Sequence, residues 1–313
     1  MAPAGKSIGA NAVPQHQERI TGRSNQWLKR FRSALGGDTS REEVVAVEGP
    51  RLVEAALESG LRVEALLVSD SGERHLAALA GHVRPETRVL LTTDRLFAGV
   101  SDTKTPQGVA ALVHPRLTTM DELLSGLPLV VVLVAIQDPG NAGTILRAAE
   151  AFGATGAACC AAGKIGTVNP LSPKALRASA GSALRLPILR GMSSTIVLAQ
   201  LRVAGVKVYA SVPHPSGARE RSGRLSGMAP GLPAVLRPWE ANWNAPAALL
   251  IGNEGAGLPE EISAAADARI SIPQKEARGT AGVESLNAAM AASIILYEAM
   301  RQRDAKQQGR KPS

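Results

Sequence analysis

Residues 127–136 read LPLVVVLVAI and form the most hydrophobic run of the chain. Its apolar residues are continuous and do not alternate with polar ones, which is typical of a parallel strand covered on both faces. The only proline, Pro128, comes at the start of the run, where a strand tolerates the missing N–H. The run therefore predicts a central strand of an open, mostly parallel α/β sheet.

Strand and helix patterns alternate on both sides of this run, as they do in other α/β folds. On its C-terminal side, strands are predicted at 155–161, 184–189, 206–212, 247–252 and 269–272, and helices at 141–152, 173–182, 193–204, 259–265 and 285–301. On its N-terminal side, strands are predicted at 44–47, 63–69, 87–93 and 108–113, and helices at 24–35, 50–59, 73–80 and 94–100. The Pro/Gly/Arg-rich stretch 213–246 is expected to be a long loop with some short elements.

These patterns predict two folded domains, and a chain of 313 residues is long enough for two cores. We expect a disordered tail over residues 1–19, a small αβ domain over 20–115 and a linker with a short helix over 116–126. The larger α/β domain is expected over 127–303, followed by a basic tail over 304–313.

Composition excludes several classes of protein. No apolar run reaches the roughly 18 residues that a membrane span needs, and the polar N-terminus lacks a signal-peptide core. The only two cysteines, Cys159 and Cys160, are adjacent, so a disulfide framework is absent. The five histidines lie apart from one another and from the cysteines, without the spacing of metal ligands. We therefore expect a cytoplasmic protein with neither a membrane partner nor a metal.

The net charge of +8 comes from the two ends of the chain. The basic residues lie in an N-terminal arm and in the tail: Arg19, Arg23, Lys29, Arg30, Arg32, Arg301, Arg303, Lys306, Arg310 and Lys311. Such ends suit a polyanion such as RNA, although they could also serve solubility alone. An aromatic content of 3% argues against binding through stacked bases.

The first polar segment at the carboxyl edge of the predicted sheet follows residue 136, and this edge is where open α/β sheets bind ligands. Asp138-Pro-Gly predicts a turn, and Asn141 is a natural N-cap for the next helix. Gly143 and Arg147 are four residues apart and share a helix face, so the glycine is expected to leave room beside Arg147. Spacing alone would equally fit a capped helix with a surface arginine.

Two further polar segments follow later strands. Gly252-Asn-Glu-Gly-Ala-Gly257 combines three glycines, which permit close backbone approach to a ligand, although a plain turn is the alternative. In the third segment, a strand ends at Ile272-Pro273, and a helix begins after a loop at Ser285-Leu286-Asn287. The apolar positions of this helix, Leu286, Met290, Ile294 and Tyr297, form one stripe, and we expect core packing from Met290 onward.

The three segments together resemble the ordered motifs of the SPOUT class of methyltransferases. The patterns NxGxxxR at 141–147, GNEGxG at 252–257 and IP…SLN at 272–287 are most similar to the SpoU (TrmH-like) branch of RNA ribose 2′-O-methyltransferases. Residues 20–25, 47–53 and 105–109 resemble the ribosomal-protein-like substrate-binding domain of that branch. The likeness covers about residues 20–301, and only the segment between Pro273 and Ser285 is longer than is usual in the family.

The resemblance implies S-adenosylmethionine (AdoMet) bound in a trefoil-knotted α/β domain. It implies that Arg147 is the catalytic arginine and that other polar residues organise it, namely Asn141, Glu254, Ser285 and Asn287. It further implies cofactor contacts from Leu250, Gly252, Asn253, Glu254, Gly257, Ile270, Ile272, Leu286 and Asn287. Because an arginine is a poor base at neutral pH, we expect Arg147 to hold RNA phosphate and align the 2′-hydroxyl.

The RNA partner is expected from the same resemblance and from the charge pattern. We expect RNA contacts from Arg23, Lys29, Arg30, Arg51, Lys104 and Arg147. The added N-terminal domain favours 23S ribosomal RNA over transfer RNA, and a transfer RNA enzyme or a non-catalytic RNA-binding protein of the same fold are the alternatives. The family and the Ala-rich final helix also imply a homodimer.

Overall fold

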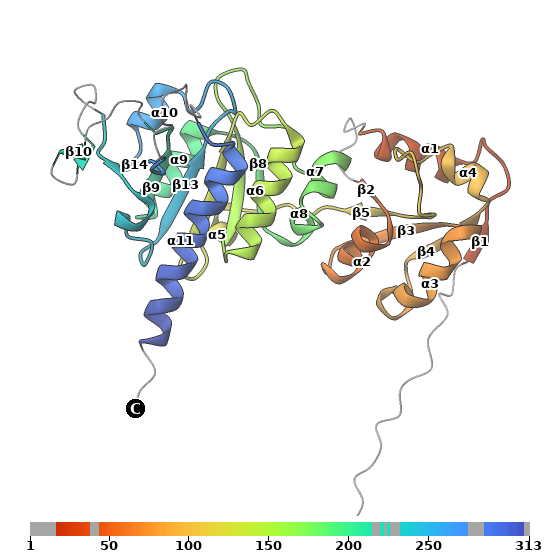
Figure 1. Ribbon diagram of the computed structural model, residues 1–313. Coiled ribbons are helices and arrows are strands. Elements are labelled where there is room, and N and C mark those ends of the chain that lie inside the picture. The colour runs from red at the N-terminus through yellow and green to blue at the C-terminus, as the bar shows by residue number, and fades with distance from the viewer. Residues whose placement is uncertain are drawn as a thin grey trace, which may run out of the picture. The chain divides into compact units, whose positions relative to one another are not determined.

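Figure 1 shows the computed structural model, which describes residues 17–37, 44–214, 220–221, 224–225, 232–274 and 285–309. The chain forms two compact units, and the boundary between them lies between Arg116 and Leu117. The predicted mixed α/β architecture, a small αβ unit followed by a larger unit with a parallel sheet, is confirmed.

The first unit is a five-stranded sheet with the order β1-β4-β3-β5-β2. Its strands are β1 (Gln17–Arg19), β2 (Val45–Glu48), β3 (Arg62–Ser69), β4 (Arg88–Thr92) and β5 (Val109–His114). Its helices are α1 (Gln26–Leu35), α2 (Pro50–Glu58), α3 (Glu73–Leu79) and α4 (Asp94–Ala98), with short 3-10 turns η1 (Asp70–Gly72) and η2 (Ala80–His82). The prediction of a disordered tail over 1–19 is wrong for its last three residues, because β1 pairs in parallel with β4.

Helix α1 shows how the sequence specifies this unit. The Asn25 side chain accepts a hydrogen bond of 2.8 Å from the backbone N–H of Trp27 and thereby caps the helix. The apolar residues of α1, from Trp27 to Leu35, share one buried face, and Phe31 is fully buried against the sheet. The charged residues of the helix therefore lie on its outer side.

The second unit is a seven-stranded sheet in which all neighbours pair in parallel, with the order β12-β14-β9-β13-β6-β7-β8. The strands are β6 (Leu129–Val134), β7 (Gly156–Ala161), β8 (Ile188–Ser193), β9 (Lys207–Ser211), β12 (Val235–Leu236), β13 (Ala247–Ile251) and β14 (Ala268–Ile270). Every residue of β6 is fully buried between β13 and β7, as its continuous apolar run predicts.

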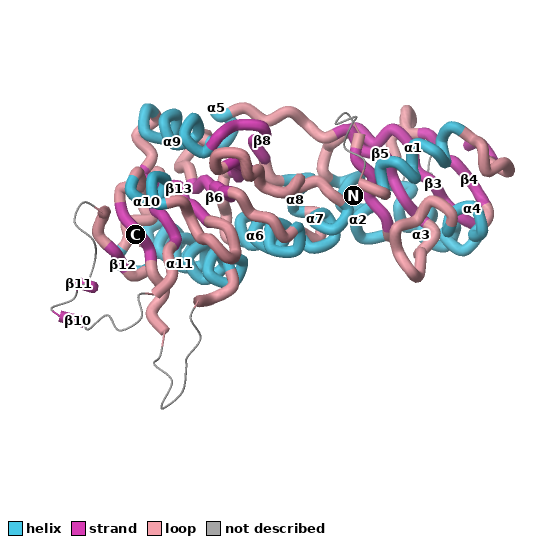
Figure 2. Tube along the Cα trace, turned by 90° about the horizontal axis from the view of Figure 1, so that it is seen from above, coloured by secondary structure: helices cyan, strands magenta, loops and turns pink. Residues whose placement is uncertain are grey.

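Helices cover both faces of this sheet (Figure 2). One face packs against α5 (Met120–Leu123), α9 (Ser194–Val203) and α10 (Glu260–Ala264). On the other face lie α6 (Pro139–Ala151) and α11 (Ala288–Gln308), which pack against each other, and α7 (Pro173–Ala178) and α8 (Ser182–Arg185) contact α6. The site-bearing segments are thereby fixed to a sheet that is covered on both sides.

Several predicted boundaries differ from the structure. Residues 117–126 belong to the second unit, because Leu123 is fully buried in its core, so they are not a free linker. The predicted helix 173–182 is two helices, since Ala180 and Gly181 adopt positive φ angles of 49° and 84°. Strand β8 accordingly begins later than predicted, and α11 starts at Ala288 and continues past residue 303.

The stretch 213–246, expected to be a loop, contains short elements in its described parts. These are the two-residue strands β10 (Glu220–Arg221) and β11 (Arg224–Leu225), the edge strand β12 and a 3-10 turn, η3 (Pro238–Glu240). The trefoil knot that the family resemblance implies stays a prediction.

The C-terminal end of α11 is tied to the start of the sheet by Arg303. Its guanidinium donates hydrogen bonds of 2.8–3.2 Å to the backbone carbonyls of Leu127, Pro128, Trp243 and Ala245. Burial lowers the pKa of Arg303, and the carbonyl oxygens compensate the lost hydration. An arginine expected in the basic tail is thus part of the fold.

The two cysteines lie side by side on β7 and are buried. Burial raises the pKa of each thiol to about 12, so both are protonated and unreactive at neutral pH. Within the described ranges, no cluster of His, Cys, Asp and Glu could hold a metal ion, and no helix there is both long and apolar enough to span a membrane.

Candidate active site

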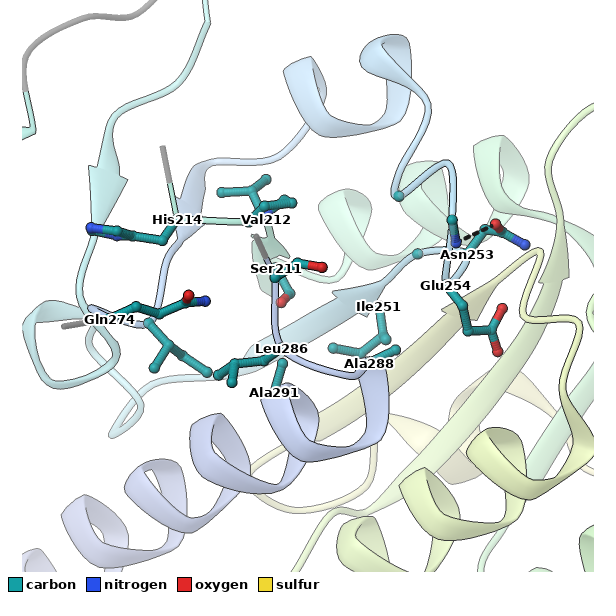
Figure 3. A pocket seen from close by; sticks show the side chains of 16 residues that line it. Ser211, Val212, His214, Ile251, Asn253, Glu254, Gln274, Leu286, Ala288 and Ala291 are labelled. Atoms are coloured by element: carbon teal, nitrogen blue, oxygen red, sulfur yellow. Dashed lines mark hydrogen bonds between the residues drawn. The ribbon is translucent and has the colours of Figure 1, made fainter. Parts of the chain in front are cut away.

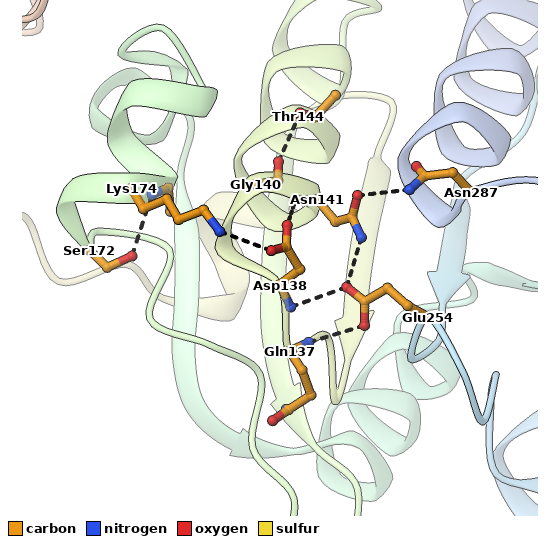
Figure 4. A network of polar contacts seen from close by, with 10 residues as sticks. Gln137, Asp138, Gly140, Asn141, Thr144, Ser172, Lys174, Glu254 and Asn287 are labelled. Carbon is orange, nitrogen blue, oxygen red and sulfur yellow. Dashed lines mark hydrogen bonds and ion pairs between the residues drawn. The ribbon is translucent and has the colours of Figure 1, made fainter.

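The three polar segments meet at the carboxyl edge of β6, β13 and β14, around the carboxylate of Glu254 (Figure 4). Asn141 Nδ2 donates to Glu254 Oε1 at 3.0 Å, and Asn287 Nδ2 donates to Asn141 Oδ1 at 3.0 Å. The backbone N–H groups of Gln137 and Asp138 donate to the same carboxylate at 3.3 and 3.2 Å. Residues more than a hundred positions apart in sequence therefore form one hydrogen-bond chain.

The charge of Glu254 is held by these donors. Burial works to raise the pKa of Glu254, but the hydrogen bond from the Asn141 side chain and the backbone N–H donors outweigh it, so the pKa lies below its usual value. Glu254 is therefore ionised at neutral pH. A fixed negative charge stands beside the pocket described below.

The start of α6 differs from the sequence-based expectation. The N-cap is Asp138, whose carboxylate accepts from the backbone N–H of Asn141 at 2.8 Å and pairs with Lys174 at 3.1 Å. The backbone N–H of Asn141 and the Lys174 ammonium together hold the pKa of Asp138 below its usual range. The prediction that Asn141 caps the helix is therefore wrong, and its side chain is left to contact Glu254 and Asn287.

Gly143 has a packing role that the sequence did not indicate. A Cβ at this position would lie 2.4 Å from the carbonyl oxygen of Ala175 and 2.7 Å from the Cβ of Ala178, so α6 and α7 touch through the glycine. The expectation that Gly143 leaves room beside Arg147 is wrong, because Gly143 is buried and Arg147 is exposed. Arg147 has no hydrogen bond or ion pair with any residue that the structure describes.

The glycine-rich segment after β13 forms a tight turn. Asn253 Oδ1 accepts from the backbone N–H groups of Gly255 and Ala256 at 2.9 and 3.0 Å, and Asn253 Nδ2 donates to the Ala135 carbonyl at 3.0 Å. A Cβ on Gly252 would lie 2.4 Å from backbone atoms of Gly257 and Leu258, so only glycine fits there. The turn presents Glu254 toward α6.

A pocket opens beside this turn, between the end of β9 and the start of α11 (Figure 3). Of the predicted site residues, the pocket is lined by Gly252, Asn253, Glu254, Gly257, Ile272, Ser285 and Leu286. Leu250 and Ile270 do not line it, since their side chains are fully buried in strands, and Asn287 belongs to the hydrogen-bond chain instead. Residues 275–284, the longer loop of the sequence analysis, lie outside the described residues.

Other residues that the sequence motifs did not indicate also line the pocket. They are Ser211, Val212, Pro213, His214, Ile251, Gly255, Gln274, Ala288 and Ala291. His214 Nδ1 lies 3.2 Å from Oγ of the buried Ser271, which fixes the imidazole at one end of the pocket. The available signal was the end of the predicted strand 206–212, because it reaches the same edge of the sheet as the other segments.

The predicted RNA-contact residues of the first unit include four exposed side chains and one that forms an ion pair. Arg23, Lys29, Arg51 and Lys104 are exposed in the first unit, whereas Arg30 forms a two-point ion pair with Glu64 at 2.6 and 2.8 Å. In α11, Arg301 pairs with Glu298, and Lys306 reaches the Asn244 carbonyl at 3.4 Å. Arg310 and Lys311 lie outside the described residues. Much of the predicted basic tail is therefore used inside the protein.

Comparison with known proteins decides the family. The model of the SpoU rRNA Methylase family matches residues 128–297, and the model of the MRM3-like substrate binding domain matches residues 39–111. The chain belongs to the SpoU methylase family. The resemblance seen in the sequence motifs is confirmed, and the protein is a methyltransferase by family.

Known relatives and solved structures match this SpoU methylase over most of its length. A 23S rRNA (uridine(2479)-2′-O)-methyltransferase of Streptomyces viridochromogenes is 30% identical, with 91% of this chain and 92% of that protein covered. The 23S rRNA (guanosine(2553)-2′-O)-methyltransferase RlmP of Bacillus subtilis is 28% identical, with 90% and 98% covered. The crystal structure of the SpoU methyltransferase AviRb from S. viridochromogenes in complex with AdoMet has a TM-score of 0.72 and 28% identity, and covers 90% of this chain and 99% of that one.

Proposed function

We propose that this protein transfers a methyl group from AdoMet to a ribose 2′-hydroxyl of 23S ribosomal RNA. The observation that carries the proposal is the chain Asn287–Asn141–Glu254, which joins all three family motifs beside a pocket. Relatives that match nearly the whole chain are named as 23S rRNA 2′-O-methyltransferases. A protein that had kept only RNA binding would have no need of this arrangement.

The residues of the pocket fit AdoMet by their chemistry. Apolar side chains such as Val212, Ile251 and Leu286 suit an adenine ring, and Ser211 and Gln274 offer hydrogen bonds to hydroxyl or amino groups. The carboxylate of Glu254 supplies a negative charge that suits a sulfonium cation. Structural neighbours with bound AdoMet support the same assignment.

The cofactor supplies an electrophilic methyl group whose departure leaves a neutral thioether, so no general acid is needed. The task of the protein is alignment, which can supply much of the rate. Asn141 and Asn287 are locked by each other and by Glu254, so the mouth of the pocket is held in one arrangement. Arg147, on the same helix as Asn141 and without an internal partner among the described residues, holds an RNA phosphate and orients the attacking hydroxyl.

Ribosomal RNA is the preferred substrate, because the first unit matches a substrate-binding domain and the relatives act on 23S rRNA by name. The exposed basic side chains Arg23, Lys29, Arg51 and Lys104 are assigned to RNA backbone contacts. A cytoplasmic location fits a ribosomal substrate and two reduced cysteines. A transfer RNA substrate is the second candidate.

Incorporation of labelled methyl groups tests the proposal. Purified protein, AdoMet and either protein-free rRNA or total tRNA are incubated, and the methylated nucleotide is identified by digestion and mass spectrometry. We expect 2′-O-methylation of rRNA alone. Methylation of tRNA alone, methylation on a base, or no methylation of either RNA would each overturn the proposal as stated.

We also propose a homodimer, and the final helix supports it in an unexpected way. The prediction that Met290, Ile294 and Tyr297 pack in the core is wrong, since these side chains are 58%, 41% and 51% exposed. The core face of α11 consists instead of Ala289, Ala292, Ile295, Leu296 and Ala299. The exposed stripe suits a second copy of the same helix. Light scattering should give twice the chain mass of 32.4 kDa, and the single mass at micromolar concentration would refute the dimer.

A further inference from the structure

We propose that the turn formed by residues 162–166 is an RNA-positioning element, in which Ile165 packs on an unpaired base and Lys164 contacts a neighbouring phosphate. The proposal rests on the proposed function, because the RNA is the substrate of the same site. It concerns a segment that none of the three family motifs includes. The turn follows β7 and leads toward α7.

The turn is held rigidly by backbone and side-chain hydrogen bonds. Ala162 and Ile165 exchange two backbone hydrogen bonds of 2.8 and 3.1 Å, and Gly163 between them adopts a φ of 57°. The Thr167 hydroxyl shares its one hydrogen between the carbonyls of Cys160 and Leu133, at 2.7 and 3.0 Å, and the Val168 N–H donates to the Ile136 carbonyl at 2.8 Å. The side chains at the tip are therefore presented in a fixed place.

The turn is connected to the candidate active site through Gln137. Gln137 Nε2 donates to the Gly166 carbonyl at 2.6 Å, while the backbone N–H of the same glutamine donates to Glu254. One residue thus links the turn to the Asn287–Asn141–Glu254 chain. We therefore expect a nucleotide adjoining the reacting ribose to contact the tip.

The chemistry of the tip fits RNA. Ile165 is 56% exposed although it is a large aliphatic side chain on a rigid turn, and Lys164 is exposed beside it. Residues 161–174 contain no acidic residue, and because Lys174 is paired with Asp138, the positive charge that the segment offers to phosphate is that of the exposed Lys164. An apolar side chain can wedge against an unstacked base, and an aliphatic residue such as Ile165 can do so without an aromatic ring.

The test compares Ile165→Ser with Ile196→Ser, which removes an isoleucine of similar exposure (49%) from α9. Binding and methylation of a protein-free 23S rRNA transcript are measured at several RNA concentrations. For Ile165→Ser we expect KM for RNA to rise by about five- to tenfold, with kcat and AdoMet affinity retained, since contacts to single bases carry effects of this order. Ile196→Ser should behave as wild type.

Two more variants separate base contact from other roles. Ile165→Trp should restore RNA affinity, since an indole stacks better on a base, and Lys164→Ala should reduce the salt dependence of binding by about one phosphate contact. If wild type methylates rRNA and the Ile165→Ser and Ile196→Ser proteins are equal, the proposal is wrong while the function stands. A change in mass of Ile165→Ser by light scattering would assign the turn to a contact between copies and would equally overturn it.

Discussion

Replacing Gly143 by alanine should destabilise the second unit even though alanine is the better helix former. The new methyl group would lie 2.4 Å from the Ala175 carbonyl oxygen and 2.9 Å from the Ser179 nitrogen, which are backbone atoms and cannot rotate away. Helix propensity gains about 1 kcal/mol, whereas overpacking that forces a backbone shift costs about 1–3 kcal/mol. With the contact so close, we expect a net loss of about 1–2 kcal/mol in the free energy of unfolding.

Urea titration followed by tryptophan fluorescence measures this loss. A Trp27→Phe background confines the emission to Trp239 and Trp243, which both belong to the second unit. The matched control is Thr144→Ala, an exposed neighbour on α6 where alanine also raises helix propensity, by up to about 0.7 kcal/mol, and meets no backbone atom, although the hydrogen bond from Thr144 Oγ1 to the Gly140 carbonyl is lost. A Gly143→Ala protein as stable as wild type, or more stable, would show that α6 and α7 separate freely and would refute the packing role.

Three further outcomes are expected from single changes. Arg147→Ala should lower the methyl-transfer rate by more than about tenfold, about 1.4 kcal/mol, with AdoMet affinity retained in calorimetry; a smaller loss would contradict its role. Glu254→Gln should lower the melting temperature above pH 4.5, and because the folded pKa of Glu254 is depressed, the difference from wild type should vanish as pH falls through that pKa. A difference that grows in acid would mean that the carboxylate is not stabilised. Arg303→Met should cost about 2–4 kcal/mol in urea titration, because four carbonyls lose their donor; a cost below about 1 kcal/mol would show that water replaces the guanidinium.

The elements with strong local signals could be predicted from the sequence. The run at 127–136 specified β6 because a strand buried on both faces must be apolar throughout. The prediction of one helix over 173–182 was wrong because the chain breaks into α7 and α8 at Ala180. This residue has a left-handed conformation, although alanine ordinarily favours helix. The predicted N-cap of α6 was three residues too late. Asp138 and Asn141 are both good N-cap residues, and only the tertiary structure determines which of them caps the helix.

The candidate site was predictable in its parts but not in its contacts. Motif resemblance selected Asn141, Glu254 and Asn287, and their hydrogen bonds depend on tertiary structure alone. Leu250 was assigned to the pocket by motif resemblance, but its side chain is fully buried in β13, and in this segment the pocket is lined only from Ile251 onward. The exposed stripe of α11 was assigned to the core because helical periodicity shows that a face is apolar but does not show what covers that face.

The buried thiols of β7 make the natural chain a ready background for chemical labelling. Cys159 and Cys160 are the only cysteines, and thiols whose pKa is raised to about 12 stay unalkylated by reagents that attack thiolates. A single cysteine placed on the surface, for example by Ile165→Cys, would then be the one site that a photoactivatable thiol reagent modifies. Crosslinking from that position would locate the RNA nucleotide that lies beside the turn without any prior removal of native cysteines.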